Sequence, residues 1–479
     1  MVRSTNRNDV KRRDFLKLAG AAATVGLLGA CAGPAAPAAT TAPAPKATEA
    51  PKPAATAAPA PAATAAPAPA ATQAPAAQQG TKTAVFWFNQ PAQMDAFQGI
   101  VDRFHKAQTK TKLDVVLVPT QDLQTKLATA IAGGEPPDAV RLHGSTTLLT
   151  LFGDKGHLLG LDDHIPNLKA TDWIPGVLEG ITRQGKIVGM PCNSGCVGLV
   201  YNPEVQKAAG LDAEKPADTW AQVLEFGAKI SKPNEQVWGH YAMTAPITAT
   251  GGDHFCTKLW GYGGREVSAD GKKATLNTPE AVAAFQWYAD LVQKNKCMPP
   301  QQINETQMLN AYLTGKVGSI TCYPSLVANI AKAPFKSLSA LVPAGPAGRK
   351  NNLGFATIGV FAKGKNWEGG LDFAKFIGLD PENLAFWNMS FGQVPPRFSS
   401  RETTMWKEYE AKTPLTKGFL EGQKLGQLPY MGPGAAEMQT EAGKAIEAVV
   451  FGQKTAKQAA DDAAAAAQII LDRELKKIQ

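Results

Sequence analysis

Apolar and polar positions near residue 83 predict a strand–helix–strand–helix–strand order. Thr83–Phe88 is a short apolar run, typical of a buried strand. The helix expected next has apolar residues at helical spacing, namely Phe97, Ile100, Val101 and Phe104. The predicted elements are strands at 83–88, 112–118 and from 137, and helices at 93–108 and 122–134. This order predicts an α/β fold with a mostly parallel sheet flanked by helices.

Polar residues follow two of these strands directly. Asn89 and Gln90 come after the first strand, and His143 and Ser145 end the third. In sheets of this type, ligands bind outside the carboxyl ends of the strands. These four residues are therefore candidate ligand contacts, with structural packing of the imidazole as the alternative for His143.

Two later patterns concern the crossings between lobes and the C-terminal helices. Short β-rich runs near 191–201 and 316–323 suggest strands that cross between lobes. The last 40 residues read as helical, and 456–475 is Ala-rich. Asp461 lies early in this segment and Lys476 late, which is the polarity that a helix dipole favours.

The first 30 residues have the pattern of an export signal. Arg12 and Arg13 form a twin-arginine motif, and the apolar run Leu18–Ala30 has 13 residues. A membrane-spanning helix needs about 20, so this run reads as a removable leader. The run ends at Cys31 in a Leu-Gly-Ala-Cys sequence that resembles a lipobox. We expect lipid on Cys31 and a location on the outer face of a bacterial cell membrane; a short basic amphipathic helix is the alternative.

Residues 31–82 read as a disordered tether. After Cys31 the segment is almost entirely Ala, Pro and Thr, without aromatic or large aliphatic residues. Such a composition cannot bury enough apolar surface to offset the entropy of ordering. Closely spaced prolines favour an extended polyproline II conformation, so the tether can reach on the order of 100 Å.

The charge pattern argues against nucleic acid as a partner. The net charge is +8, but the leader before Cys31 carries half of it, with six Lys or Arg and two Asp. The exported part is only weakly basic and has no Lys/Arg cluster with interleaved aromatic residues.

The cysteine pattern predicts no metal site and leaves the disulfides open. Five cysteines follow Cys31, an odd number that implies at least one unpaired or intermolecular thiol. Cys192 and Cys196 have no second pair or nearby His to complete a zinc site. In an extended segment their Cα atoms would lie about 13 Å apart, beyond disulfide reach. Cys256 with Cys297 is the one pairing considered, and the fifth thiol is Cys322.

Several short motifs occur in an order that resembles one known family. They are Leu127–Asp138, Gly156–Asp162, Gly185–Pro191, Gly198–Asn202, Ala209–Leu211, Thr219-Trp220, Gly315–Ile320 and Gly392–Pro396. The chain resembles the extracellular solute-binding proteins of family 1, the carbohydrate-type receptors of ABC importers that include maltose-binding protein. The likeness covers the whole exported part, and no single motif is catalytic.

The resemblance implies a two-lobe periplasmic-binding-protein fold of type II with crossing hinge segments. On that template, lobe one takes 83–190 and 318–362, and lobe two takes 191–317 and 363–479. It also implies a monomeric, lipid-anchored receptor that captures a small solute, most simply a mono- or oligosaccharide, and delivers it to the membrane subunits of an ABC permease.

The resemblance and the needs of a sugar ligand suggest further contacts. A sugar site needs aromatic plates and polar groups in the ring plane, contributed by both lobes. Asn193, Ser194 and Gly195 match family positions on the cleft floor, and Tyr323 falls where the family places a stacking aromatic. The other candidates are Trp260, Tyr262 and Arg397. Core packing is the alternative for Trp260, and exposure to solvent is the alternative for Arg397.

Two other functions remain as alternatives. An exported enzyme such as a glycosidase needs only two carboxylates, which sequence does not exclude. The chain lacks cysteine groupings for iron–sulfur or haem ligation, a G-x-G-x-x-G after a strand, and the G-x-S-x-G and H-E-x-x-H motifs. No catalytic residue and no cofactor are therefore expected. A solute sensor for a membrane signalling protein would share the receptor fold.

Overall fold

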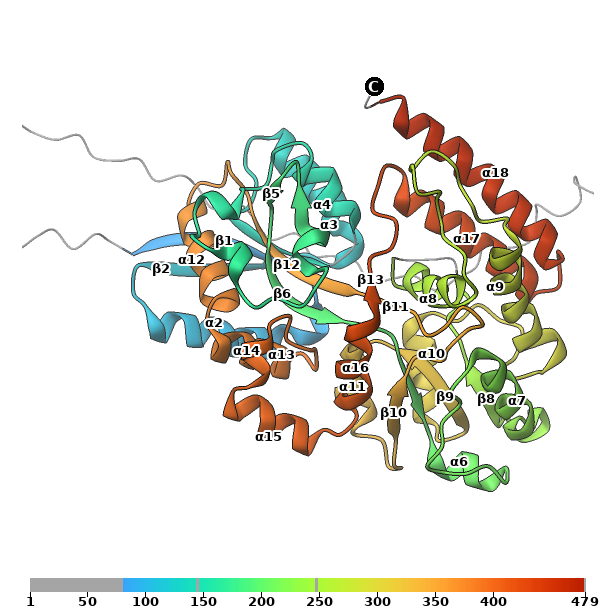
Figure 1. The fold of residues 1–479 in the computed structure, drawn as a ribbon. Helices are drawn as coiled ribbons and strands as arrows, with labels where there is room; N and C mark the ends of the chain where they lie inside the picture. Colours follow the sequence, from blue (N-terminus) through green and yellow to red (C-terminus); the bar gives the residue numbers. More distant parts are fainter. Residues whose placement is uncertain (1–80, 144–145, 246–248, 478–479) are drawn as a thin grey trace, which may run out of the picture. The chain divides into compact units, whose positions relative to one another are not determined.

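The computed structural model describes residues 81–143, 146–245 and 249–477. Arg12, Arg13, Cys31, the tether and Ser145 lie outside the described residues. The described residues gather into one compact unit. Within this unit, two hydrophobic cores form around two β-sheets, so it has two lobes (Figure 1).

The sheet of lobe one has five strands in the order β2-β1-β3-β12-β6. Its strands are β1 (Lys82–Phe88), β2 (Thr111–Leu117), β3 (Ala139–His143), β6 (Met190–Gly195) and β12 (Gly354–Val360). The first three are mutually parallel, as predicted, whereas β12 is antiparallel to both β3 and β6. The helices of this lobe are α2 (Met94–Ala107), α3 (Thr120–Ala132), α4 (Thr146–Gly153), α5 (Val177–Ile181), α12 (Trp367–Gly378), α13 (Pro381–Ser390), α14 (Phe398–Arg401) and α15 (Thr404–Lys412). A small hairpin consists of β4 (Thr182–Arg183) and β5 (Lys186–Ile187).

The apolar pattern of the first strand and helix accounts for the core of lobe one. Phe86 and Phe88 alternate with partly buried Trp87 along β1, and both are fully buried. Phe97 of α2 stacks on Phe88 with ring centroids 4.1 Å apart. Its helical-spacing partners, Ile100 among them, are buried as well. The predicted helix thus covers the predicted strand through the residues that define its apolar face.

The sheet of lobe two has four strands in the order β10-β7-β9-β8. Its strands are β7 (Gly198–Tyr201), β8 (Trp238–Tyr241), β9 (Val317–Cys322) and β10 (Leu338–Leu341). Strands β8 and β9 are parallel, and β7 is antiparallel to β9 and β10. The helices of this lobe are α6 (Pro203–Ala208), α7 (Trp220–Ile230), α8 (Ala249–Gly261), α9 (Pro279–Ala289), α10 (Glu305–Leu313), α11 (Val327–Ile330), α16 (Thr416–Gly422), α17 (Ala435–Val450) and α18 (Ala456–Leu475). Helix α18 coincides with the Ala-rich segment, and Thr455 caps it.

The chain passes between the two sheets within residues 196–197, 342–353 and 413–415. The second passage contains β11 (Asn351–Asn352), which pairs in parallel with β13 (Gly426–Gln427).

These passages differ from the lobe boundaries that the sequence suggested. Residues 318–341 were expected in lobe one but supply β9 and β10 to the second sheet. Residues from 363 to 412 were expected in lobe two, yet α12 packs on β1 and β12 of the first sheet. A short β-rich run is compatible with either sheet. Its pairing with strands distant in the sequence decides which sheet it joins, and the local sequence pattern does not record that pairing.

Candidate functional site

The residues after β1 are held in place by the chain itself. Asn89 is buried, and its Oδ1 accepts a hydrogen bond of 2.9 Å from Nη1 of Arg141. Its carbonyl oxygen accepts another from the hydroxyl of Thr120. The Nδ2 donor of Asn89 has no partner. Gln90 is half-buried and precedes a short 3₁₀ turn.

Strand β12 aligns the carboxyl ends of β3 and β6. The backbones of His143 and Asn193 both pair with Ala356, one on either side. The structure therefore brings these two positions to one edge of the first sheet. The Asn193 side chain is buried, whereas the His143 side chain is not among the described ones.

Ser194 is part of a buried link between β6 and a later segment. Its hydroxyl accepts a hydrogen bond of 2.8 Å from Nε2 of Gln423 and donates to the carbonyl oxygen of Val394. Gln423 in turn accepts from the guanidinium of Arg401. The hydroxyl of Ser194 thus links β6 to Val394 and Gln423, two residues far along the chain.

Tyr323 lies where the crossing segments meet. It follows β9, and its hydroxyl donates a hydrogen bond of 2.6 Å to Oδ1 of Asn352 in β11. A Cβ added at Gly354 would come within 3.1 Å of the Tyr323 ring, and one added at Gly195 within 3.4 Å. Both glycines therefore give the ring room at the ends of β6 and β12. Of the residues predicted from sequence, the structure brings Gly195 and Tyr323 together.

Two buried nitrogen atoms near Tyr323 have no hydrogen-bond partner among the described residues. The His254 ring lies edge-on to Tyr323 at a centroid distance of 5.7 Å, and its Nδ1 is 3.4 Å from the Thr321 hydroxyl. Its Nε2 is unpartnered, as is Nδ2 of Asn352. Burial, and secondly Lys258, lowers the pKa of His254 to about 3, so the imidazole is neutral at pH 7.

Sequence reasoning missed His254 and Asn352. His254 sits inside helix α8 and Asn352 in a two-residue strand, so neither follows a predicted strand end. A polar residue at a helical position that is otherwise buried is the one available signal for His254. Buried polar groups are nearly always satisfied in native proteins, by protein, water or ligand. We therefore define the crossover cluster as Tyr323, His254 and Asn352, with Gly195 and Gly354.

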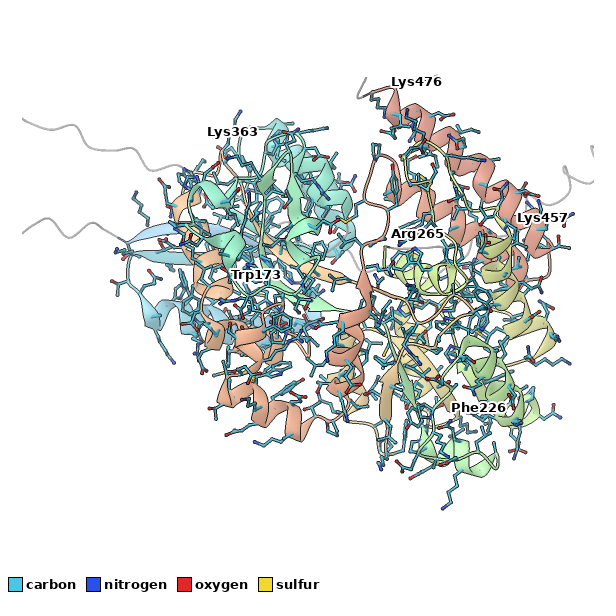
Figure 2. All side chains as sticks on the ribbon, viewed as in Figure 1. Trp173, Phe226, Arg265, Lys363, Lys457 and Lys476 are labelled. Carbon is cyan, nitrogen blue, oxygen red and sulfur yellow. The ribbon has the colours of Figure 1, made fainter. Side chains whose placement is uncertain are left out.

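The other two aromatic candidates belong to the end of α8. Trp260 is buried, and its Nε1 donates a hydrogen bond of 2.7 Å to Oε2 of Glu266. The guanidinium of Arg265, labelled in Figure 2, lies 5.2 Å from the Trp260 ring centroid. Tyr262 is half-buried against the core of lobe two. Trp260 thus has the packing role that was its alternative reading.

Arg397 is engaged within lobe one by several partners. Its Nε and Nη2 lie 2.9 and 2.8 Å from Oδ1 of Asp172. Its Nη1 donates to two carbonyl oxygens, of Gly378 and Leu379. The guanidinium also lies 5.4 Å from the ring centroid of Trp173, a residue labelled in Figure 2. Arg397 is 9% exposed, so the structure shows an internal tie in place of the solvated side chain that sequence allowed.

We call this group the Arg397 cluster. It consists of Arg397, Asp172, Trp173 and the carbonyl oxygens of Gly378 and Leu379. Burial would raise the pKa of Asp172, but hydrogen bonds from Ser399 and Arg397 outweigh it and hold the pKa below its usual range. The carboxylate is therefore charged at neutral pH, opposite the guanidinium.

The cysteines after Cys31 are all buried. The Cys256–Cys297 pairing is not formed, because the Cys256 thiol donates to Glu266 while that of Cys297 faces the Leu224 carbonyl oxygen. Burial raises the pKa of Cys192 and of Cys196 to about 12. Within the described ranges, no three His, Cys, Asp or Glu side chains are placed to hold a metal ion. Within the same ranges, no helix has the length and apolarity needed to cross a bilayer.

Two solved binding proteins have this architecture. The cyclic alpha-maltosyl-1,6-maltose binding protein from Arthrobacter globiformis matches with a TM-score of 0.71 and 24% identity, over 82% of this chain and 100% of that one. UgpB from Mycobacterium tuberculosis, solved with glycerophosphocholine, matches with a TM-score of 0.72 and 22% identity, over 83% and 100%. Two α/β lobes with polar side chains gathered at the crossing segments thus define a type II periplasmic binding protein, as the sequence predicted.

The chain belongs to the bacterial extracellular solute-binding protein family, whose model matches residues 87–383. A similar protein is the sn-glycerol-3-phosphate-binding periplasmic protein UgpB of Pectobacterium atrosepticum, 26% identical over 81% of this chain and 91% of that protein. The homologue from Escherichia coli K12 is 25% identical over 80% and 91%. Capture of a small solute outside the cytoplasm for import, the function expected from sequence, is therefore confirmed at this level.

Proposed function

We propose that this chain is a lipid-anchored receptor that binds a small, hydroxyl-rich solute at the crossover cluster and delivers it to an ABC import permease. The observation that carries the site is the pair of unpartnered buried nitrogens beside Tyr323, on His254 and Asn352. A ligand that accepts or donates hydrogen bonds there recovers free energy that the unliganded protein lacks.

Tyr323 supplies the aromatic face of this site. A half-buried phenol ring offers a plate for the C–H face of a sugar ring, while its hydroxyl is held by Asn352. Among the described residues, Nδ2 of Asn89 has no partner, and we propose that this atom, at the end of β1, supplies a donor from lobe one. The site then takes contacts from both lobes, so that closing around the ligand is favourable.

Export and anchoring rest on the leader. We propose that the twin arginines, Arg12 and Arg13, direct export and that lipid on Cys31 holds the protein at the outer face of the membrane. The tether then keeps the receptor at high effective concentration near its permease. Replacement of Cys31 by Ala should release the protein from the membrane fraction into the extracytoplasmic soluble fraction. An unchanged membrane fraction would contradict lipid anchoring.

A thermal-shift screen of the full 479-residue chain tests the receptor. The probes are maltose, mannotriose, tagatose, glycerol 3-phosphate and glycerophosphocholine. A ligand at 100 times its Kd stabilises the folded state by about 2.7 kcal/mol, which is an easily measured shift. Stabilisation without turnover supports the receptor. Chemical conversion of the stabilising probe would instead indicate an enzyme.

A further inference from the structure

Glu305 is a carboxylate that the topology brings to the ligand-binding edge of lobe two. It is the first residue of α10, which ends at Leu313 and leads through a short turn into β9. Helix α10 packs on β9 (Figure 1), so it runs back along the strand that follows it. The start of α10 therefore lies near the carboxyl end of β9, where Tyr323 follows. Burial, and secondly the charge of Glu305, raises the pKa of the Cys322 thiol at that end of β9.

The second observation is that the Glu305 carboxylate has no partner within the part of the chain that the structure describes. Among the described residues, no hydrogen bond or ion pair involves it, although the residue is half-buried and burial raises its pKa. Glu266, in the same lobe, shows the contrast. It accepts hydrogen bonds from Trp260, Cys256 and the backbone of Tyr430. The Glu305 oxygens are not among the fully buried atoms, so they remain open to water or to a ligand.

The other groups of the crossover cluster carry no charge at neutral pH. His254 is neutral, and Asn352 and Tyr323 offer an amide and a phenol. Three cations are engaged elsewhere. Lys258, one turn after His254, is buried with its ammonium against the rings of Trp220 and Trp287. Arg265 donates to Gln427 and lies against Trp260, and Arg397 is held by Asp172. The edge thus combines uncharged hydrogen-bonding groups with one acceptor that is anionic.

We propose that Glu305 contacts the solute and selects an uncharged, hydroxyl-rich ligand over a phosphate monoester. This inference rests on the proposed receptor function. Hydroxyl groups donate charge-assisted hydrogen bonds to a carboxylate, which are about twice as strong as neutral ones. A phosphate monoester offers no donor on its charged end, and its negative charge is repelled by Glu305 in a site shielded from water.

Variants of Glu305 in the full chain test the inference by thermal shift and calorimetry with the five probes named above. At least one uncharged sugar should bind the wild-type protein, and glycerol 3-phosphate should bind more weakly. Glu305→Gln should weaken sugar binding about ten- to a hundredfold, as expected for loss of a hydrogen bond to a charged group. Glu305→Asp, which keeps the charge on a shorter side chain, should fall between the two.

Glu280→Gln is the matched control. Glu280 is also half-buried in the first turn of a helix of lobe two and makes no hydrogen bond among the described residues. Its helix, α9, packs mainly on α8, α17 and α18. Glu280→Gln should therefore leave sugar affinity unchanged. The unfolding midpoint without ligand should show that each variant is folded.

Three results would overturn the inference. They are tighter binding of glycerol 3-phosphate than of every sugar, an unchanged sugar affinity in a folded Glu305→Gln protein, and failure of every uncharged sugar to bind. In the first two the receptor function stands and only the role of Glu305 fails. If no probe binds at all, or if a probe is converted, the proposed function fails with it.

Discussion

Two buried polar clusters in this protein differ in how completely their groups are satisfied. In the Arg397 cluster, the guanidinium bonds Asp172 and two carbonyl oxygens and lies over Trp173. In the crossover cluster, Tyr323 bonds Asn352, but a nitrogen of Asn352 and one of His254 remain without partners. The first lies within lobe one, and the second lies where the chain passes between the lobes.

We propose that this difference separates a structural role from a binding role. A buried polar group costs free energy unless it is hydrogen-bonded, so a complete cluster stabilises the fold and has nothing left to offer a ligand. An incomplete cluster stores unmet hydrogen-bonding capacity that a solute can use. The comparison predicts that changes in the Arg397 cluster lower stability, whereas changes in the crossover cluster lower affinity.

The largest expected effect is the loss of Arg397. Arg397→Ala leaves Asp172 without its cation and frees two carbonyl oxygens, and we expect the free energy of unfolding to fall by about 3 kcal/mol. Urea denaturation of the purified protein measures this change. Affinity for a stabilising sugar, measured where the variant is folded, should stay the same. A variant of unchanged stability and reduced affinity would instead make Arg397 a ligand contact and break the comparison.

Unlike Arg397, the buried cation Lys258 has no carboxylate partner among the described residues. Its ammonium lies 4.1 Å from the Trp220 ring centroid, 4.7 Å from that of Trp287 and 5.2 Å from that of Tyr288. Its one hydrogen bond, of 3.5 Å, goes to the carbonyl oxygen of His254. On the strand beneath, His240 is also neutral because burial, and then Lys258, lowers its pKa to about 3. Burial lowers the pKa of Lys258 from 10.5 to about 7.

The second prediction concerns the pH dependence that Lys258 imposes. Between pH 7 and 10 the unfolded chain binds this proton more tightly than the folded one, so Lys258 makes stability rise with pH across that window. Lys258→Met should therefore be more stable than wild type below pH 7, by roughly 1–4 kcal/mol as for other buried charges replaced by apolar groups. The advantage should disappear near pH 10. Thermal unfolding of both proteins from pH 6 to 10 tests this, and a constant difference would be evidence against it.

The same contrast shows what the sequence predicts and what it leaves open. The first strand and helix follow from Phe86, Phe88 and Phe97, because periodicity records which face each residue buries. Tyr323 became a candidate because it falls, after a β-rich run, where the resembled family places a stacking aromatic. Asn352 and His254 were missed because their importance comes from pairing β11 with β13 and from α8 lying against Tyr323, contacts between residues distant in sequence. Whether a buried polar group is satisfied depends on such contacts, so sequence alone did not separate Arg397 from Tyr323.

The third prediction compares two tyrosines, one in the crossover cluster and one in the core of lobe two. Tyr323→Phe removes the hydroxyl that donates to Asn352, and Tyr312→Phe removes one that donates to Ser337 at 2.9 Å in the core of lobe two. Each variant should lose about 1 kcal/mol of stability, the usual net contribution of one hydrogen bond. Only Tyr323→Phe should weaken sugar binding, as calorimetry would show. Equal effects of both variants on affinity would remove the crossover cluster from the site.

The smallest expected effect comes from an ion pair on the surface. Lys457, labelled in Figure 2, and Asp461 lie one turn apart on α18, and the distance from nitrogen to oxygen is 2.6 Å. Both side chains are exposed to solvent, by 63% and 45%. Water screens such a pair, so Lys457→Ala should change the free energy of unfolding by less than about 0.5 kcal/mol and leave affinity unchanged. The same urea experiment serves as measurement. A loss of unfolding free energy close to that of Arg397→Ala would contradict the comparison. It would mean that burial and complete hydrogen bonding do not explain the stabilising role of the Arg397 cluster.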